Sequence, residues 1–187
     1  DGLSYFVMEY IEGEPITDYC DARNMPVRAR LDLFRQVCSA VQFAHQNLIV
    51  HRDLKFPNVL IRPDFKPVII DFGIAKSFRD GTVAITEHEA ICPYTLQYAA
   101  PEQYLPQWKA EVKYKADQFA IGVMSFYLLT EKFPFGAAKE IGPMQLMNNV
   151  LNNDVIKPTS LVPDINPRLE ACILKFLGVK PYQRFRN

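Results

Sequence analysis

Residues 116–130 are apolar at almost every position and lack the polar face of an amphipathic helix. A helix that is apolar all round is a buried helix. The run is shorter than the roughly 18 residues that a membrane-spanning helix needs, so the rest of the chain must cover it. We therefore expect a buried helix within a mainly helical domain, in which Asp117 needs hydrogen-bond partners.

Other segments show helical periodicity. After Pro26, apolar residues recur at spacings of three and four, which indicates one buried stripe made of Leu31, Phe34, Cys38, Val41 and Ala44. Shorter helices are expected from a cap at Thr17 to about Asn24, over 142–152 and over 168–177.

Short strands are expected between the helices. Residues 3–11 are rich in aromatic and β-branched side chains and precede a turn at 12–15, and residues 48–50 form a second apolar run. Residues 59–61 and 68–70 should pair as a hairpin, because proline and aspartate occupy their connection.

Composition narrows the classes of partner. The 187 residues suffice for one domain with a core, and 49% hydrophobic residues argue against disorder. Lys plus Arg equals Asp plus Glu at 21 each, without the basic excess of a nucleic-acid binder. The four cysteines are scattered, which indicates reduced thiols and a cytoplasmic location. No apolar run is long enough to cross a membrane, so any membrane anchor of the full-length protein is expected outside this segment.

Side chains that could transfer a phosphoryl group lie on either side of the expected hairpin. This chemistry needs a base that orients the acceptor hydroxyl, a fixed cation and Mg²⁺. Asp53 and Lys55 suit the first two roles, and the oxygens of Asn58 and Asp71 suit Mg²⁺. The hairpin would bring Asn58 and Asp71 to the same end, and Gly73 would let the backbone turn after Asp71.

Each motif alone has a plainer interpretation. His51-Arg52-Asp53 could be a surface ion-pair cluster, Asp71-Phe72-Gly73 a turn, and Asn58 a turn cap. Their order and spacing together favour a catalytic loop followed by a metal-binding loop.

In this order the residues resemble the larger, C-terminal lobe of Hanks-type protein kinases, over essentially the whole chain, and look most like the bacterial members. The resemblance implies a protein-kinase-like α+β fold over 1–187, with a hinge strand and a short hairpin on a mainly helical lobe. It also implies an activation segment at 71–102 that Ala100-Pro101-Glu102 closes. Residues 74–99 show no sustained period, and we expect them to be a long surface loop.

The family's roles map onto individual residues. By resemblance, Asp53 is the catalytic base, Lys55 contacts the transferred phosphate, and Asn58 and Asp71 bind the Mg²⁺ that accompanies ATP. The adenine site would consist of a gatekeeper Met8, the backbone of Glu9 and Ile11, and Leu60 below the ring.

The same resemblance implies structural partners. Arg184 should pair with Glu102, because an unpaired buried carboxylate is costly. Asp117 should accept hydrogen bonds from backbone amides near His51, the alternative being an exposed helix cap. His51 should pack against Phe72, whereas His45 and His88 are expected to be bystanders.

Specificity and regulation follow from the resemblance too. Lys55 and Thr95 favour serine and threonine acceptors, and Arg52 is expected to bind a phosphate on Thr86 or Thr82 that orders the loop. The alternative is that both threonines are ordinary solvated loop residues. The chain departs from the family at Phe56, where proline is usual, and at Tyr94, where glycine is usual.

The sequence therefore predicts a serine/threonine kinase that uses ATP and Mg²⁺ on protein substrates. A pseudokinase scaffold and a small-molecule kinase are the alternatives. The family's glycine-rich loop, strand lysine and helix glutamate are expected upstream, in an N-lobe. Residues 1–187 alone should then bind ATP weakly or not at all.

Overall fold

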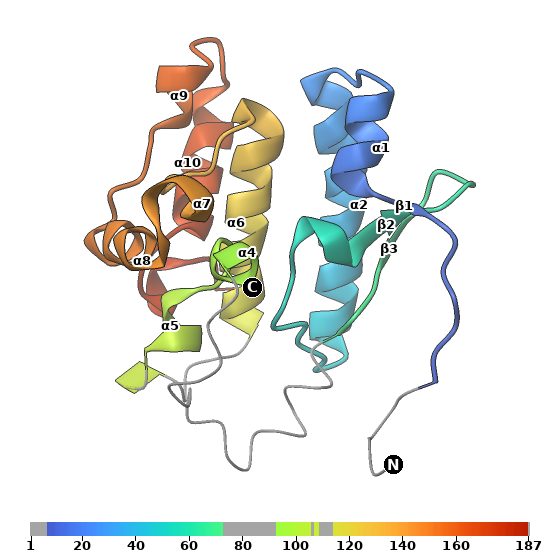
Figure 1. The fold of residues 1–187 in the computed structure, drawn as a ribbon, viewed down its shortest axis with the longest axis horizontal. Coiled ribbons are helices and arrows are strands. Elements are labelled where there is room, and N and C mark those ends of the chain that lie inside the picture. Colours follow the sequence, from blue (N-terminus) through green and yellow to red (C-terminus); the bar gives the residue numbers. More distant parts are fainter. Residues whose placement is uncertain (1–6, 73–92, 106, 109–113, 187) are drawn as a thin grey trace.

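The computed structural model describes residues 7–72, 93–105, 107–108 and 114–186. These residues form a mainly helical domain with one small sheet (Figure 1). The α-helices are α1 Ile16–Ala22, α2 Val27–Gln46, α4 Pro93–Leu96, α5 Pro101–Tyr104, α6 Tyr114–Thr130, α7 Ala138–Ile141, α8 Pro143–Asn152, α9 Pro158–Leu161 and α10 Pro167–Phe176. The other elements are the strands β1 Glu14–Pro15, β2 Val59–Ile61 and β3 Pro67–Ile69 and the 3-10 helices η1 Phe56–Asn58 and η3 Pro181–Gln183.

Helix α6 is the buried helix that the sequence predicted. Figure 1 shows it between α2 and α10, and both of these helices contact it. Met124 and Leu128 pack into one apolar cluster with α1, α2 and β2, whereas Val123 and Phe126 pack into a second cluster with α5, α8 and α10. Because both clusters use α6, the helix joins the two halves of the core. Among the described residues, none of the helices is long and apolar enough to cross a bilayer.

The expected helix after Pro26 is confirmed as α2, with Pro26 at its N-cap. Its fully buried face is slightly rotated from the expected stripe. Phe34, Val41 and Ala44 are buried, while Leu31 and Cys38 are only partly buried and Leu33 and Val37 complete the face. The expected helices over 142–152 and 168–177 correspond to α8 and α10, each within one residue at either end.

The three strands form an antiparallel sheet in the order β1-β2-β3. The expected hairpin is confirmed, with Val59 opposite Ile69 and Ile61 opposite Pro67. Beyond the last pair, Ile70 N–H donates to the Asn58 carbonyl oxygen at 2.9 Å. The hairpin therefore holds the residue that precedes Asp71 beside Asn58.

The strand expected over 3–11 is wrong for the part that the structure describes. Residues 7–11 have no strand conformation, and the side chains of Val7 and Tyr10 are 90% and 87% exposed. Strand propensity largely reflects packing against a neighbouring strand. The first strand instead forms at Glu14–Pro15, inside the predicted turn, because it pairs there with β2.

Three further local expectations are corrected. Residues 48–50 are not a strand: Leu48 has a φ of 61°, and Ile49 N–H donates back to the Ala44 carbonyl oxygen, so the segment ends α2. Thr17 is not a cap, since α1 begins at Ile16 after Pro15. Part of the expected loop over 74–99 is the short helix α4, and residues 73–92 lie outside the described residues.

Candidate active site

Asp117 is the anchor of the candidate catalytic loop. Its carboxylate is 1% exposed and accepts hydrogen bonds from the N–H groups of His51 and Arg52, each at 2.8 Å. The expected backbone partners are therefore present, and the alternative of an exposed cap is wrong. His45 Nε2 lies 2.8 Å from the same carboxylate, so the expectation that His45 is a bystander is also wrong. His88 lies outside the described residues.

His51 connects the catalytic loop to the segment before Asp71. Its Nδ1 accepts from the Asp53 N–H at 3.2 Å, and its Nε2 lies 2.9 Å from the Ile70 carbonyl oxygen. These partners assign the proton to Nε2. The ring centroid is 4.7 Å from that of Phe72, which is the expected packing. Backbone groups thus engage both ring nitrogens, so His51 links the backbone at Asp53 to the backbone at Ile70.

Asp53, Lys55 and Thr95 meet at the wall of one pocket. Lys55 Nζ lies 2.9 Å from Asp53 Oδ2 and donates to Thr95 Oγ1 at 3.4 Å. The pocket has a volume of about 160 Å³ and is also lined by Arg52, Tyr98 and Gln103. Burial raises the pKa of the Tyr98 hydroxyl. A carboxylate held by an ammonium group beside a threonine can orient and deprotonate a hydroxyl that enters this pocket.

Asn58 and Asp71 lie at the same end of the hairpin, as expected. Asn58 Nδ2 donates to the Asp53 carbonyl oxygen at 2.9 Å, so its Oδ1 is the atom that could bind a cation. Asp71 is exposed and has a φ of 55°. Within the described residues, no three His, Cys, Asp or Glu side chains form a metal cluster. An amide oxygen and one carboxylate still fit Mg²⁺, which commonly takes its remaining ligands from water and phosphate.

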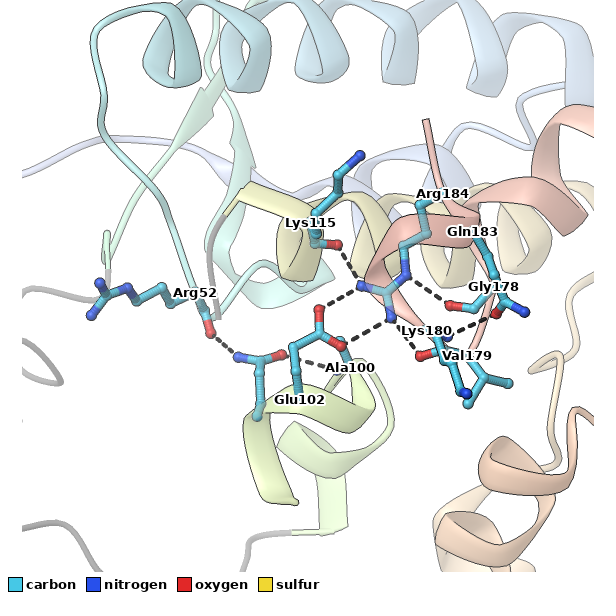
Figure 2. A network of polar contacts seen from close by, with 10 residues as sticks. Arg52, Ala100, Glu102, Lys115, Gly178, Val179, Lys180, Gln183 and Arg184 are labelled. Carbon is cyan, nitrogen blue, oxygen red and sulfur yellow. Dashed lines mark hydrogen bonds and ion pairs between the residues drawn. The ribbon is translucent and has the colours of Figure 1, made fainter. Parts of the chain in front are cut away.

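Glu102 and Arg184 form the expected buried ion pair (Figure 2). Arg184 Nη1 and Nη2 donate to the two Glu102 carboxylate oxygens at 2.6 and 3.0 Å, and both side chains are 0% exposed. Arg184 also donates to the carbonyl oxygens of Lys115, Gly178 and Val179. The pair therefore joins α5 to the end of the described chain.

Sequence reasoning missed two glutamines near the site. Gln103 Nε2 donates to the Arg52 carbonyl oxygen at 2.7 Å, and its Oε1 accepts from the Ala100 N–H at 2.9 Å. Buried Gln97 bonds to the backbone of Gly136 and Ala138. A glutamine at the third position of α5 is a recognisable helix-start signal, but its second partner cannot be inferred from sequence.

The residues expected to surround the adenine ring are exposed or half-buried. Met8 and Glu9 are exposed and Ile11 is half-buried. Leu60 is half-buried on β2, between the buried Val59 and Ile61, and so points to the opposite face of the strand from them. The predictions for Gly73, Thr82 and Thr86 lie outside the described residues.

The chain matches known proteins over almost its whole length. A family model described as protein kinase domain matches residues 2–186. The serine/threonine-protein kinase PknB of Mycolicibacterium smegmatis is 31% identical over 189 residues, which cover 99% of this chain and 29% of that protein. The serine/threonine-protein kinase Pkn1 of Myxococcus xanthus is 35% identical over 190 residues, covering 98% of this chain and 26% of that protein. The chain thus spans less than a third of the length of these relatives.

Proposed function

The chain belongs to the protein kinase domain family, and we propose that the protein containing it transfers the γ-phosphoryl group of ATP to serine or threonine hydroxyls of other proteins. The observation that carries the proposal is the contact of Lys55 with both Asp53 and Thr95 at one pocket. The relatives named above support it, since their names describe serine/threonine-protein kinases.

In the proposed reaction, Asp53 accepts the proton of the acceptor hydroxyl. The hydroxyl oxygen forms a bond to the γ-phosphorus as the bond between that phosphorus and the bridging oxygen of ADP breaks. Lys55 keeps a positive charge next to Asp53 and the incoming phosphate, where developing negative charge is stabilised. Thr95 positions the Lys55 ammonium group toward the acceptor.

Asn58 Oδ1 and the Asp71 carboxylate would hold Mg²⁺, and Met8, Glu9, Ile11 and Leu60 would border the adenine. When bound, the ion neutralises charge on the phosphate oxygens. The hydrogen bond from Asn58 Nδ2 to the Asp53 backbone fixes the direction of the amide. The ion-binding residue and the base are therefore held in one local structure.

Residues 71–102 form the activation segment in this proposal, and phosphate on Thr86, or on Thr82, would pair with Arg52 and order it. Thr86→Ala in the full-length protein should then lower activity. Unchanged activity and unchanged protease resistance of the loop would contradict the regulatory role of Thr86.

Asp53→Asn tests the reaction itself. The amide keeps the shape of the side chain but cannot accept a proton from the hydroxyl, so kcat for peptide phosphorylation should fall by roughly a thousandfold or more, with the KM for ATP little changed. Radiolabelled phosphate transfer followed by phosphoamino-acid analysis measures both rate and acceptor. Asp64→Asn, at the exposed hairpin tip, is the control and should leave kcat unchanged.

Two results would contradict the proposal. If phosphate appears on tyrosine alone, the assigned acceptor class is wrong. If the native full-length protein transfers no phosphate but binds partner proteins, the chain belongs to a scaffold.

A further inference from the structure

The peptide unit between Arg52 and Asp53 is held at both ends by side chains. Its oxygen, the Arg52 carbonyl oxygen, accepts a hydrogen bond from Gln103 Nε2 at 2.7 Å. Its hydrogen, on the Asp53 nitrogen, is donated to His51 Nδ1 at 3.2 Å. A peptide unit is planar, so fixing its oxygen and its hydrogen fixes its orientation. That orientation sets the direction in which the Asp53 side chain leaves the backbone.

Arg52 has a backbone conformation that needs such support. Its φ is 65°, in the left-handed region, which is unfavourable for a non-glycine residue and persists only where the surrounding structure holds it. Asp117 holds the Arg52 N–H at 2.8 Å, and Gln103 holds its carbonyl group. Asp117 belongs to the central helix α6, whereas Gln103 belongs to α5, at the C-terminal end of the proposed activation segment.

We propose that Gln103 is a positioning residue that aims the Asp53 carboxylate by holding the Arg52 carbonyl group. The end of the activation segment is thereby coupled to the base. This inference rests on the proposed function. The oxygen of the same side-chain amide stabilises the start of α5, because Oε1 accepts from the N–H of the N-cap residue Ala100 at 2.9 Å. One substitution can therefore separate the two roles.

Gln103→Glu is that substitution. Glutamate is favoured at this helix position, and one of its carboxylate oxygens can still accept from the Ala100 N–H. Its other oxygen replaces the Nε2 donor and repels the Arg52 carbonyl oxygen. In the full-length protein, kcat should fall roughly ten- to a hundredfold, while the KM for ATP stays within about twofold. The Tm should fall less than in a variant that loses both hydrogen bonds of Gln103.

The pH profile of Gln103→Glu distinguishes positioning from a general structural defect. A protonated glutamate has an O–H that can donate to the Arg52 carbonyl oxygen. The ratio of variant to native kcat should therefore rise as the pH falls. A ratio that is low and constant with pH would overturn the inference.

Gln103→Met has nearly the same length but neither donor nor acceptor. It should lose kcat to a similar degree and lower the Tm more than Gln103→Glu does, because the Ala100 N–H loses its partner as well as the Arg52 carbonyl oxygen. Gln145→Glu, on the exposed face of α8, is the matched control and should change neither quantity. Native kcat in a folded Gln103→Glu or Gln103→Met protein would overturn the inference.

A native protein that transfers no phosphate would overturn the proposed function. The positioning claim is then decided by hydrogen exchange of the Asp53 amide. Exchange should be faster in Gln103→Glu than in the native protein if Gln103 holds this peptide unit. Equal exchange rates would overturn the inference.

Discussion

At Asp117, one buried carboxylate gathers groups that lie far apart in the chain. It accepts from the N–H groups of His51 and Arg52 and from His45 Nε2, 65 to 72 residues away. A carboxylate this deeply buried requires several donors to offset its lost hydration. The hydrogen bonds of Asp117 therefore hold the proposed catalytic loop against α6.

His45→Leu should destabilise the protein by about 1–3 kcal/mol, because the buried Asp117 carboxylate loses a donor. Urea unfolding measures the change. Gln46→Leu is the control: it introduces leucine at the next, exposed position of α2 and should change stability by about 0.5 kcal/mol or less. Equal effects of the two substitutions would show that His45 contributes nothing through Asp117.

At this scale local motifs were predictable, and so were the distant pairs that the family resemblance implied, such as Glu102 with Arg184. Distant partners outside the resemblance were missed. Asp53, Lys55 and Asn58 could be predicted as a group because their spacing within one loop carries the signal. His45 and Gln103 could not, because no motif assigns them a role and their partners lie 72 and 51 residues away. A histidine or a glutamine in a helix has many possible partners until the fold selects one.

The helices were predictable where a long stretch of sequence carries a clear apolar pattern, either on one face or all round. Helices α2 and α6 follow from their apolar patterns because each presents that pattern over many turns. The two-residue strand β1 was missed, since a strand so short exists only through its pairing with β2. Residues 48–50 were misassigned because their apolar composition concealed the end of a helix.

Gly122 lets α6 and α10 approach closely. A Cβ atom there would lie 2.7 Å from Phe176 Cβ and 3.0 Å from Leu177 Cδ2. Gly122→Ala should destabilise the protein by about 1–2 kcal/mol, since overpacking outweighs the better helix propensity of alanine. Ser125→Ala, at a half-buried position of the same helix, tests the propensity effect alone. A stabilised Gly122→Ala protein in urea unfolding would show that the two helices can separate at little cost.

The whole molecule should lose stability at alkaline pH through its buried thiols and phenols. Burial, with a further effect of Cys172, raises the pKa of the Cys38 thiol from 9.0 to about 11. A pKa that is higher in the folded state contributes stability that is complete below about pH 9 and disappears as the pH rises to about 11. For this shift the loss is on the order of 2 kcal/mol.

Urea unfolding of Cys38→Ala and of the native protein between pH 7 and 11 measures this contribution. The variant is expected to lose less stability than the native protein above pH 9. Tyr98 and Tyr104, whose pKa values burial also raises, remain in both proteins, so the difference isolates Cys38. Parallel profiles would show that the Cys38 thiolate is not disfavoured by folding.

The Glu102–Arg184 ion pair links two residues that are 82 positions apart in the sequence. Removing either partner leaves a charge buried without its counterion, which typically costs about 3–5 kcal/mol. We expect this loss in Glu102→Gln and in Arg184→Met, measured by urea unfolding. Lys66→Met, which removes an exposed partner of Asp64, should cost about 1 kcal/mol or less.

The double variant Glu102→Leu/Arg184→Met separates the charge from the backbone contacts. With both charges removed, the protein should be more stable than the Arg184→Met single variant, because no unpaired carboxylate remains buried. Recovery should be incomplete, since the carbonyl oxygens of Lys115, Gly178 and Val179 still lack the donors that Arg184 supplied. Full recovery would mean that the pair contributes through charge alone. No recovery would mean that Arg184 acts mainly by tying these three carbonyl groups together.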